Sequence, residues 1–231
     1  MTVDFQESLF DGMPVSGAET SAGPGPAAGP ALGDLGRQVR RHQLSHGAWV
    51  DACPGWVSGS ADLFAKLVRT VPWHAERREM YERVVDVPRL LKFYGEGQTL
   101  PDALLERARA ALSDHYRAEL GEDFTTAGLC YYRDGRDSVA WHGDTIGRSR
   151  TEDTMVAIVS FGEPRRLSLR PRQGVPGADG DRQRRLEFLL GHGDLVVMGG
   201  SCQRTWEHAI LKTSRPVGPR ISVQFRPRGV R

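Results

Sequence analysis

Cysteine is scarce in this chain, and long apolar runs are missing. Its 231 residues include three cysteines, Cys53, Cys130 and Cys202, an odd number with no Cys-x-x-Cys pair. This argues against a disulfide framework and favours a reducing compartment. No stretch approaches the roughly 20 apolar residues that a membrane-spanning helix needs, and the acidic start MTVDFQESLFDGM lacks the apolar core of a signal peptide. We therefore expect a cytoplasmic protein with no membrane segment.

Net charge is also small, at +2, but positive charge is unevenly distributed. Residues 165–231 contain 14 Lys or Arg and 5 Asp or Glu, a local excess of 9 positive charges. Such an excess suits a polyanionic partner, because Lys and Arg displace counterions from phosphates. A solvated, Arg-rich surface explains the composition equally well, since closeness along the chain is not clustering in space.

The length fits one large domain preceded by an arm. Residues 16–36 are mostly Gly, Ala, Pro and Ser, and such a segment buries too little apolar surface to offset the entropy cost of ordering it. We expect residues 1–36 to form a flexible arm and residues 37–231 to form the domain.

Two helices are expected in the first half of the domain. Ser60 is a candidate N-terminal cap for a helix whose apolar face is formed by Leu63, Phe64, Leu67 and Val68. A second helix is expected to begin near Pro101 and to end at Gly121, because its apolar residues recur at spacings of three and four.

After Thr125 the pattern changes to short strands separated by Gly and Pro. Eight strands are expected, over residues 127–132, 138–142, 154–160, 166–170, 185–190, 194–198, 205–210 and 220–225. That number favours a sandwich or barrel, and a jelly roll fits it. The expected fold class is α+β: a jelly-roll (double-stranded β-helix) core of about eight strands, with the N-terminal helices packed on one sheet.

The segment Trp141-His142-Gly143-Asp144 is a candidate metal site. On an extended strand, residues two apart project from the same face, so His142 and Asp144 are expected to reach one ion. His208, 64 residues after Asp144 on another expected strand, is the candidate third ligand. Two His and one carboxylate form the facial triad of non-heme Fe(II) oxygenases. Zn²⁺ accepts the same ligands, with water completing the site.

The C-terminal segment RISVQFR alternates polar and apolar residues, which puts Arg220, Ser222, Gln224 and Arg226 on one face. The Cα atoms of its two arginines are expected roughly 20 Å apart on an extended strand, and long side chains leaning inward would embrace a small dicarboxylate. Arginine suits this role because its guanidinium holds a carboxylate through two parallel hydrogen bonds. A solvent-facing basic edge strand is the alternative.

The ordered set of His-x-Asp, a distant His and Arg-x5-Arg resembles the AlkB-like family of Fe(II)- and 2-oxoglutarate-dependent dioxygenases. Residues 129–135 resemble that family's cosubstrate strand, 159–162 the strand after the metal motif, and 190–200 the strand before the second His. The resemblance extends from about Val85 to Arg228. It implies a jelly-roll enzyme that oxidatively dealkylates nucleic-acid bases and releases succinate, CO2 and an aldehyde.

The resemblance also implies cofactors, partners and roles. Fe(II), 2-oxoglutarate and O2 are the expected cofactor and cosubstrates, and alkylated DNA or RNA is the expected partner, with the base single-stranded or flipped out. A monomer engaged in DNA repair is expected. The implied metal ligands are His142, Asp144 and His208; the 2-oxoglutarate residues are Tyr132, Arg220, Ser222 and Arg226; the substrate candidates are Arg89, Tyr94 and Ile146. His192 is not a ligand in the family pattern and is expected to be structural.

Two positions depart from the family pattern. Cys130 stands where the family usually has Asn, and Ile146 stands where its base-repair members tend to have an acidic residue that contacts the base. Ile146 therefore leaves open the same oxygenase chemistry on a protein or small-molecule substrate, which the basic C-terminal segment 165–231 opposes. A catalytically silent nucleic-acid-binding module is a further alternative, opposed by the intact triad and the arginine pair.

Overall fold

The computed structural model of this chain describes residues 29–80, 83–175 and 185–230. Most of the arm expected over residues 1–36 thus lies outside the described residues. The last part of that arm packs on the domain: β1 (Ala31–Leu32) pairs with β4 (Val57–Ser58), and Leu35 in the short helix α1 (Leu35–Gln38) is buried. The described domain therefore begins before residue 37.

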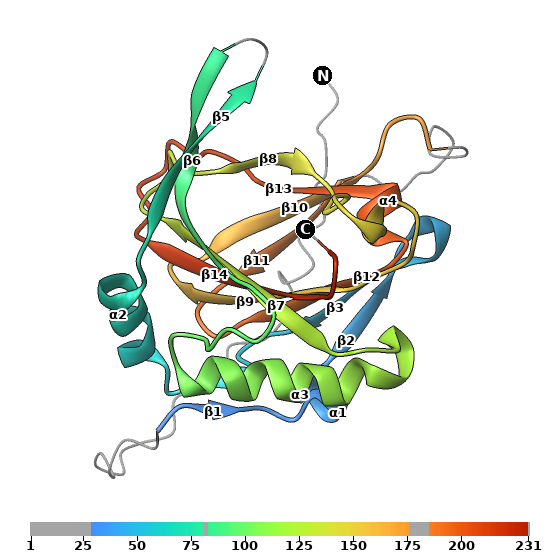
Figure 1. Cartoon of the computed structure of the whole chain (residues 1–231), viewed down its shortest axis with the longest axis horizontal. Coiled ribbons are helices and arrows are strands. Elements are labelled where there is room, and N and C mark those ends of the chain that lie inside the picture. Colours follow the sequence, from blue (N-terminus) through green and yellow to red (C-terminus); the bar gives the residue numbers. More distant parts are fainter. Residues whose placement is uncertain (1–28, 81–82, 176–184, 231) are drawn as a thin grey trace, which may run out of the picture.

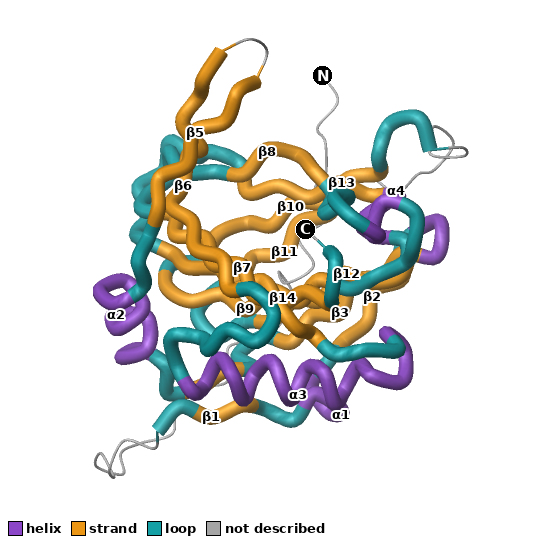
Figure 2. The backbone as a smooth tube through the Cα atoms, in the orientation of Figure 1, coloured by secondary structure: helices purple, strands orange, loops and turns teal. Residues whose placement is uncertain are grey.

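Two antiparallel sheets form the body of the molecule (Figures 1 and 2). The larger sheet has the order β2 (Arg40–Gln43), β3 (Ala48–Cys53), β12 (Leu195–Gly200), β9 (Val156–Gly162), β14 (Arg220–Pro227), β7 (Phe124–Tyr132), β6 (Arg83–Tyr94) and β5 (His74–Met80). The smaller sheet has the order β11 (Leu186–Leu190), β10 (Arg165–Pro171), β13 (Trp206–Ile210) and β8 (Val139–His142).

Helices cover the side of the larger sheet that faces away from the smaller one (Figure 1). The two longest helices are α2 (Ala61–Thr70) and α3 (Ala103–Leu120); α4 (Cys202–Thr205) is a single turn, and η1 (Ser45–Gly47) and η2 (Arg148–Arg150) are 3-10 turns. None of the helices in the described part of the chain is long and apolar enough to cross a membrane.

Side-chain alternation divides the apolar interior into two cores. On β14, Ile221, Val223 and Phe225 face the helices in the outer core, together with Leu104 and Leu112 of α3. An inner core lies between the sheets and contains side chains from both, among them Ile158, Leu167, Leu169, Phe188, Trp206 and Ile210. The even-numbered residues Arg220, Ser222, Gln224 and Arg226 of β14 point to the opposite side and line a cavity beside the inner core.

The eight strands expected after Thr125 correspond to β7 to β14, with shifted ends. Thr205 was expected in a strand but ends α4, and β13 begins at Trp206. The strand expected over residues 194–198 extends to Gly200 as β12. Gly199 is glycine because a Cβ there would lie 2.1 Å from the Trp49 ring. The larger sheet also contains β2, β3, β5 and β6, which the expected set of strands does not include.

The two expected helices are present as α2 and α3, but their N-terminal capping differs from that expected. Helix α3 begins after Asp102, whose carboxylate accepts from the Leu104 N–H at 2.8 Å, and it ends at Gly121 with φ of 80°. Ser60 precedes α2 but makes no capping hydrogen bond. Its hydroxyl instead lies 2.8 Å from His192 Nε2, and His192 Nδ1 accepts from the Gly162 N–H, so His192 is structural.

A buried carboxylate joins β3 to α3. Asp51, 2% exposed, accepts two hydrogen bonds of 2.8 Å from Arg41 and one of 2.9 Å from the buried hydroxyl of Tyr116. Arg41 also pairs with Glu119 at 2.9 Å, at a more exposed position. Through Arg41 and Tyr116, Asp51 therefore connects β2 and β3 of the larger sheet to helix α3.

Asp51→Ala is expected to lower the free energy of unfolding by about 1–3 kcal/mol, since the buried Tyr116 hydroxyl would lose its acceptor. Arg41 would keep Glu119 and reach water. Urea unfolding measures the change, with Glu119→Ala as the control, expected to cost at most about 1 kcal/mol because that pair is solvated. Equal losses in the two variants would contradict this role for Asp51.

Candidate active site

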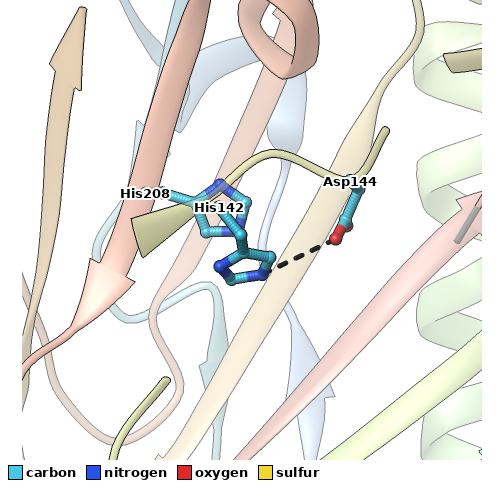
Figure 3. A group of neighbouring side chains, drawn as sticks. All are labelled: His142, Asp144 and His208. Carbon is cyan, nitrogen blue, oxygen red and sulfur yellow. Dashed lines mark ion pairs between the residues drawn. The ribbon is translucent and has the colours of Figure 1, made fainter. Parts of the chain in front are cut away.

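The three expected metal ligands meet between the sheets (Figure 3). His142 ends β8 and is the cross-strand partner of His208 on β13, with ring centroids 4.3 Å apart. One ligand atom from each of His142, Asp144 and His208 lies within 4.8 Å of the others. Asp144 is not on the strand, as the parity argument assumed, but in the turn that follows it, where Thr145 N–H donates to the Gly143 carbonyl.

The His142 ring is oriented by its own strand. Its Nδ1 lies 2.8 Å from the carbonyl oxygen of Ala140. A carbonyl only accepts, so Nδ1 carries a proton, and Nε2 is the ring atom directed toward Asp144 Oδ1, 3.7 Å away. A histidine held through its second nitrogen is typical of metal ligands.

Charge in the site favours metal-binding protonation states. Burial opposes ionisation of Asp144, but Arg226, whose Nε donates to Asp144 Oδ2 at 2.8 Å, holds the pKa of this carboxyl well below its usual range. Burial, followed by the neighbouring His142, lowers the pKa of His208 to about 3. Near neutral pH the set is therefore a carboxylate and at least one neutral imidazole, the forms that bind a divalent metal.

Arg220 lies at the other end of β14 and is 1% exposed. Its Nε donates to Ser160 Oγ at 2.8 Å, but Nη1 and Nη2 find no hydrogen-bond partner within the described residues. Burial lowers the pKa of the guanidinium, so an anion is needed to compensate the charge. The two unpartnered terminal nitrogens of the guanidinium can donate two parallel hydrogen bonds to one carboxylate. Arg220 therefore fits a carboxylate of 2-oxoglutarate.

Tyr132 pairs with Arg220 across the sheet, and the guanidinium lies 5.3 Å from the ring centroid. Burial raises the pKa of Tyr132 to about 12, so its hydroxyl remains protonated and can donate to an anion. Ser160, which sequence reasoning did not single out, is the cross-strand partner of Ser222. Its role became visible only through the strand register.

One cavity connects the metal ligands with Arg220. It is lined by Arg89, Cys130, Tyr132, Val139, His142, Asp144, Ile158, Leu167, His208, Ile210, Arg220, Ser222, Gln224 and Arg226. Gln224 is a lining residue to which the sequence assigned no role. The Cys130 thiol, standing in place of the family's Asn, donates to Gln224 Oε1 at 3.6 Å.

The substrate candidates do not all lie together. Arg89 lines the cavity and donates to the Ser138 carbonyl at 3.0 Å. Ile146 is 65% exposed, two residues beyond Asp144. Tyr94 packs against the outer core, on the other face of the larger sheet. It lies five positions after Arg89 on β6, and residues an odd number of positions apart on a strand point to opposite faces. Tyr94 therefore does not belong to this site.

Known proteins resemble the chain in sequence and fold. The sequence pattern of the 2OG-Fe(II) oxygenase superfamily matches residues 66–226. The chain is 31% identical over 196 residues to the alpha-ketoglutarate-dependent dioxygenase alkB homolog 3 of Bos taurus, covering 77% of this chain and 67% of that protein. It is 27% identical over 223 residues to the DNA oxidative demethylase ALKBH2 of Mus musculus, covering 88% and 89%.

Among solved structures, OsALKBH1 matches with a TM-score of 0.50 at 14% identity, covering 80% of this chain and 100% of that one. This likeness supports the jelly-roll fold and nothing finer. The chain spans about two thirds of the length of the alkB homolog 3 relatives, 67% for the Bos taurus and 66% for the Homo sapiens protein.

Arg220→Ala is expected to weaken 2-oxoglutarate binding at least tenfold, because a desolvated carboxylate without its partner costs about 2–5 kcal/mol. Arg220→Lys should fall between, since it keeps the charge but not the two-pronged contact. Calorimetry with Mn²⁺ present measures the affinity. Arg228→Ala, at a position 73% exposed just beyond β14, is the matched control. Unchanged affinity in Arg220→Ala would remove the guanidinium from the cosubstrate site.

Proposed function

Because the chain belongs to the 2OG-Fe(II) oxygenase superfamily, we propose that it is an oxidative demethylase that removes alkyl groups from nucleic-acid bases. The observation that carries the proposal is a single cavity with a two-histidine, one-carboxylate set at one end and an unpartnered, buried guanidinium at the other. The names of two relatives, a dioxygenase and a DNA oxidative demethylase, support the same activity.

His142, Asp144 and His208 would hold Fe(II), because two imidazoles and one carboxylate are the ligand set of non-heme iron oxygenases. When bound, Fe(II), 2-oxoglutarate and O2 supply the oxidising power to hydroxylate a carbon on a base nitrogen, giving succinate, CO2 and an aldehyde. Arg220 would bind the distal carboxylate of 2-oxoglutarate, with the Tyr132 side chain beside it. Ser160 holds the Nε of Arg220 and thereby orients the guanidinium.

Ser222 and Arg226 line the space between these two ends. Arg226 acts mainly through Asp144: its ion pair keeps the carboxylate charged and directs one oxygen, leaving the other toward His142. Within the family's Arg-x5-Arg pattern, the two arginines thus lie at different ends of one cavity, Arg220 away from the metal ligands and Arg226 beside Asp144.

On the substrate side, Arg89 and Ile146 are the proposed contacts with the nucleotide. A base inside a duplex cannot reach a cavity between two sheets, so it is bound single-stranded or flipped out. The proposed partner is alkylated DNA or RNA, the proposed assembly a monomer, and the proposed location the cytoplasm. The basic segment 165–231 supports a nucleic-acid partner, and the three cysteines, none of which is in a disulfide, support a reducing compartment.

A second candidate is the same chemistry on a protein or small-molecule substrate. Ile146 favours it, because an exposed apolar side chain next to Asp144 cannot accept a hydrogen bond from the amino group of a base. A catalytically silent nucleic-acid-binding module is disfavoured, because such a module has no need of an unpartnered guanidinium behind a metal-ligand set.

Succinate formation distinguishes these functions. The protein is incubated with Fe(II), 2-oxoglutarate and O2, together with methylated or plain oligonucleotides in single- and double-stranded form. We expect methylated single strands to stimulate turnover several-fold over plain ones, and Asp144→Ala to form none. Succinate formation that no oligonucleotide stimulates would favour the second candidate. The absence of any succinate would favour the silent module.

Substrate choice is expected to depend on Ile146. The wild type should show no strong preference for 1-methyladenine or 3-methylcytosine, and Ile146→Asp should shift preference toward them about tenfold or more, since a charge-assisted hydrogen bond contributes about 1.5–3 kcal/mol. Oligonucleotides with one lesion each, including a methylated thymine and an etheno adduct, measure this. A wild type already most active on 1-methyladenine and 3-methylcytosine would show that another residue makes that contact.

A further inference from the structure

The one-turn helix α4 lies between β12 and β13, directly before the strand that carries His208. It is held at its start, where the Ser201 hydroxyl donates to the His46 carbonyl at 2.7 Å and lies 2.9 Å from Thr205 Oγ1. Cys202 and Gln203 are 2% and 1% exposed. A short helix fixed in this way can serve as a rigid support for its neighbours.

Gln203 reaches from α4 to the turn that carries Asp144. Its Oε1 accepts from the Asp144 N–H at 2.9 Å, in a buried position. Because an N–H needs an acceptor, this contact also determines which end of the amide is oxygen. The other end, Nε2, has no hydrogen-bond partner in the described part of the chain. A buried amide nitrogen without a hydrogen-bond partner is unfavourable. The stability of the fold alone therefore does not explain why residue 203 is a glutamine.

The same turn lies unusually close to α4 at Gly143. A Cβ at this position would be 2.2 Å from the backbone oxygen of Gln203 and 2.7 Å from Arg172 Nη2. Only glycine allows this approach, which is what brings the Asp144 N–H within reach of the Gln203 side chain. The two contacts are neighbours along the chain and act on the same peptide.

Asp144 is held at three points, and Gln203 differs from the other two. Ser149, from the chain just after the turn, donates its hydroxyl to the Asp144 carbonyl, and Arg226 binds the carboxylate. Gln203 lies five residues before His208, so one continuous segment, α4 and β13, both supplies a ligand and holds the backbone of another. Loss of this contact would free Asp144 to move relative to His208.

We propose that Gln203 is a positioning residue for the metal site: through the Asp144 N–H it sets the distance between the Asp144 carboxylate and His208. Its main effect is on metal affinity, with only a small contribution to the stability of the fold. The proposal rests on the metal-ligand set within the proposed function, but it requires neither nucleic acid nor 2-oxoglutarate.

The test is Mn²⁺ titration of the metal-free full chain, by calorimetry, together with thermal unfolding without metal. Gln203→Leu should bind Mn²⁺ at least about tenfold more weakly, since residues that orient metal ligands typically change affinity 10–100-fold. Its melting temperature should fall only slightly, because the buried Asp144 N–H loses its acceptor but the unpaired Nε2 is removed at the same time. Gln203→Glu keeps an acceptor oxygen for the Asp144 N–H and should retain most of the affinity.

Arg204→Leu, at the next residue of α4, is the matched control. It removes an ion pair with Asp153 on the surface and leaves the Asp144 contact in place, so Mn²⁺ affinity should not change. If Gln203→Leu does not fold, Gln203→Met replaces it with the same expectation. Wild-type Mn²⁺ affinity in the folded leucine or methionine variant would overturn the proposal, and so would a glutamate variant as weak as either. The wild type binding no Mn²⁺ would instead overturn the metal site itself.

Discussion

The ion pair between Arg226 and Asp144 is the contact on which the site depends. Arg226 belongs to β14 in the larger sheet, whereas Asp144 follows β8 at the edge of the smaller sheet, so the pair joins the two sheets where the metal ligands meet. Burial opposes ionisation of Asp144, and Arg226 is the largest of the neighbouring charges that lower the pKa of this carboxyl. The pair therefore directs one oxygen of the Asp144 carboxylate and favours the charged form of the ligand.

The same strand determines the other end of the cavity. Alternation along β14 sends every second side chain into the space between the sheets, from Arg220 to Arg226, while the residues between them anchor the strand in the outer core. Arg220 is a buried cation whose terminal nitrogens have no partner in the described structure, and Gln203 Nε2 is in the same condition. Such groups reduce stability, and they are expected where a protein is built to bind something else.

Much of this arrangement could be predicted from local pattern. The strands after Thr125 alternate and are separated by glycine and proline, and the His-x-Asp, His and Arg-x5-Arg set follows in order. Strand β3 could not be found this way, because all six residues of AWVDAC are buried and no alternation marks the strand. Its buried Asp51 is explained only by Arg41 and by Tyr116, 65 residues away.

The site residues that sequence reasoning missed share one property. Ser160, Gln203 and Gln224 act through residues distant in sequence, and their roles depend on strand register or on a helix one turn long. Tyr94 is the opposite case, since its odd separation from Arg89 already places the two on different faces of a strand. Asp144 reaches the site for a reason other than strand parity, because the turn at Gly143 and not the strand directs it inward.

The most direct test of the account is an anaerobic optical titration of the purified chain with Fe(II), followed by 2-oxoglutarate. The account predicts a visible charge-transfer band that appears only when both are present, that saturates at a single equivalent of iron, and that is missing from His208→Ala. That band persisting in His208→Ala, or failing to form in the wild type, would contradict the assignment of this cavity as an iron and 2-oxoglutarate site.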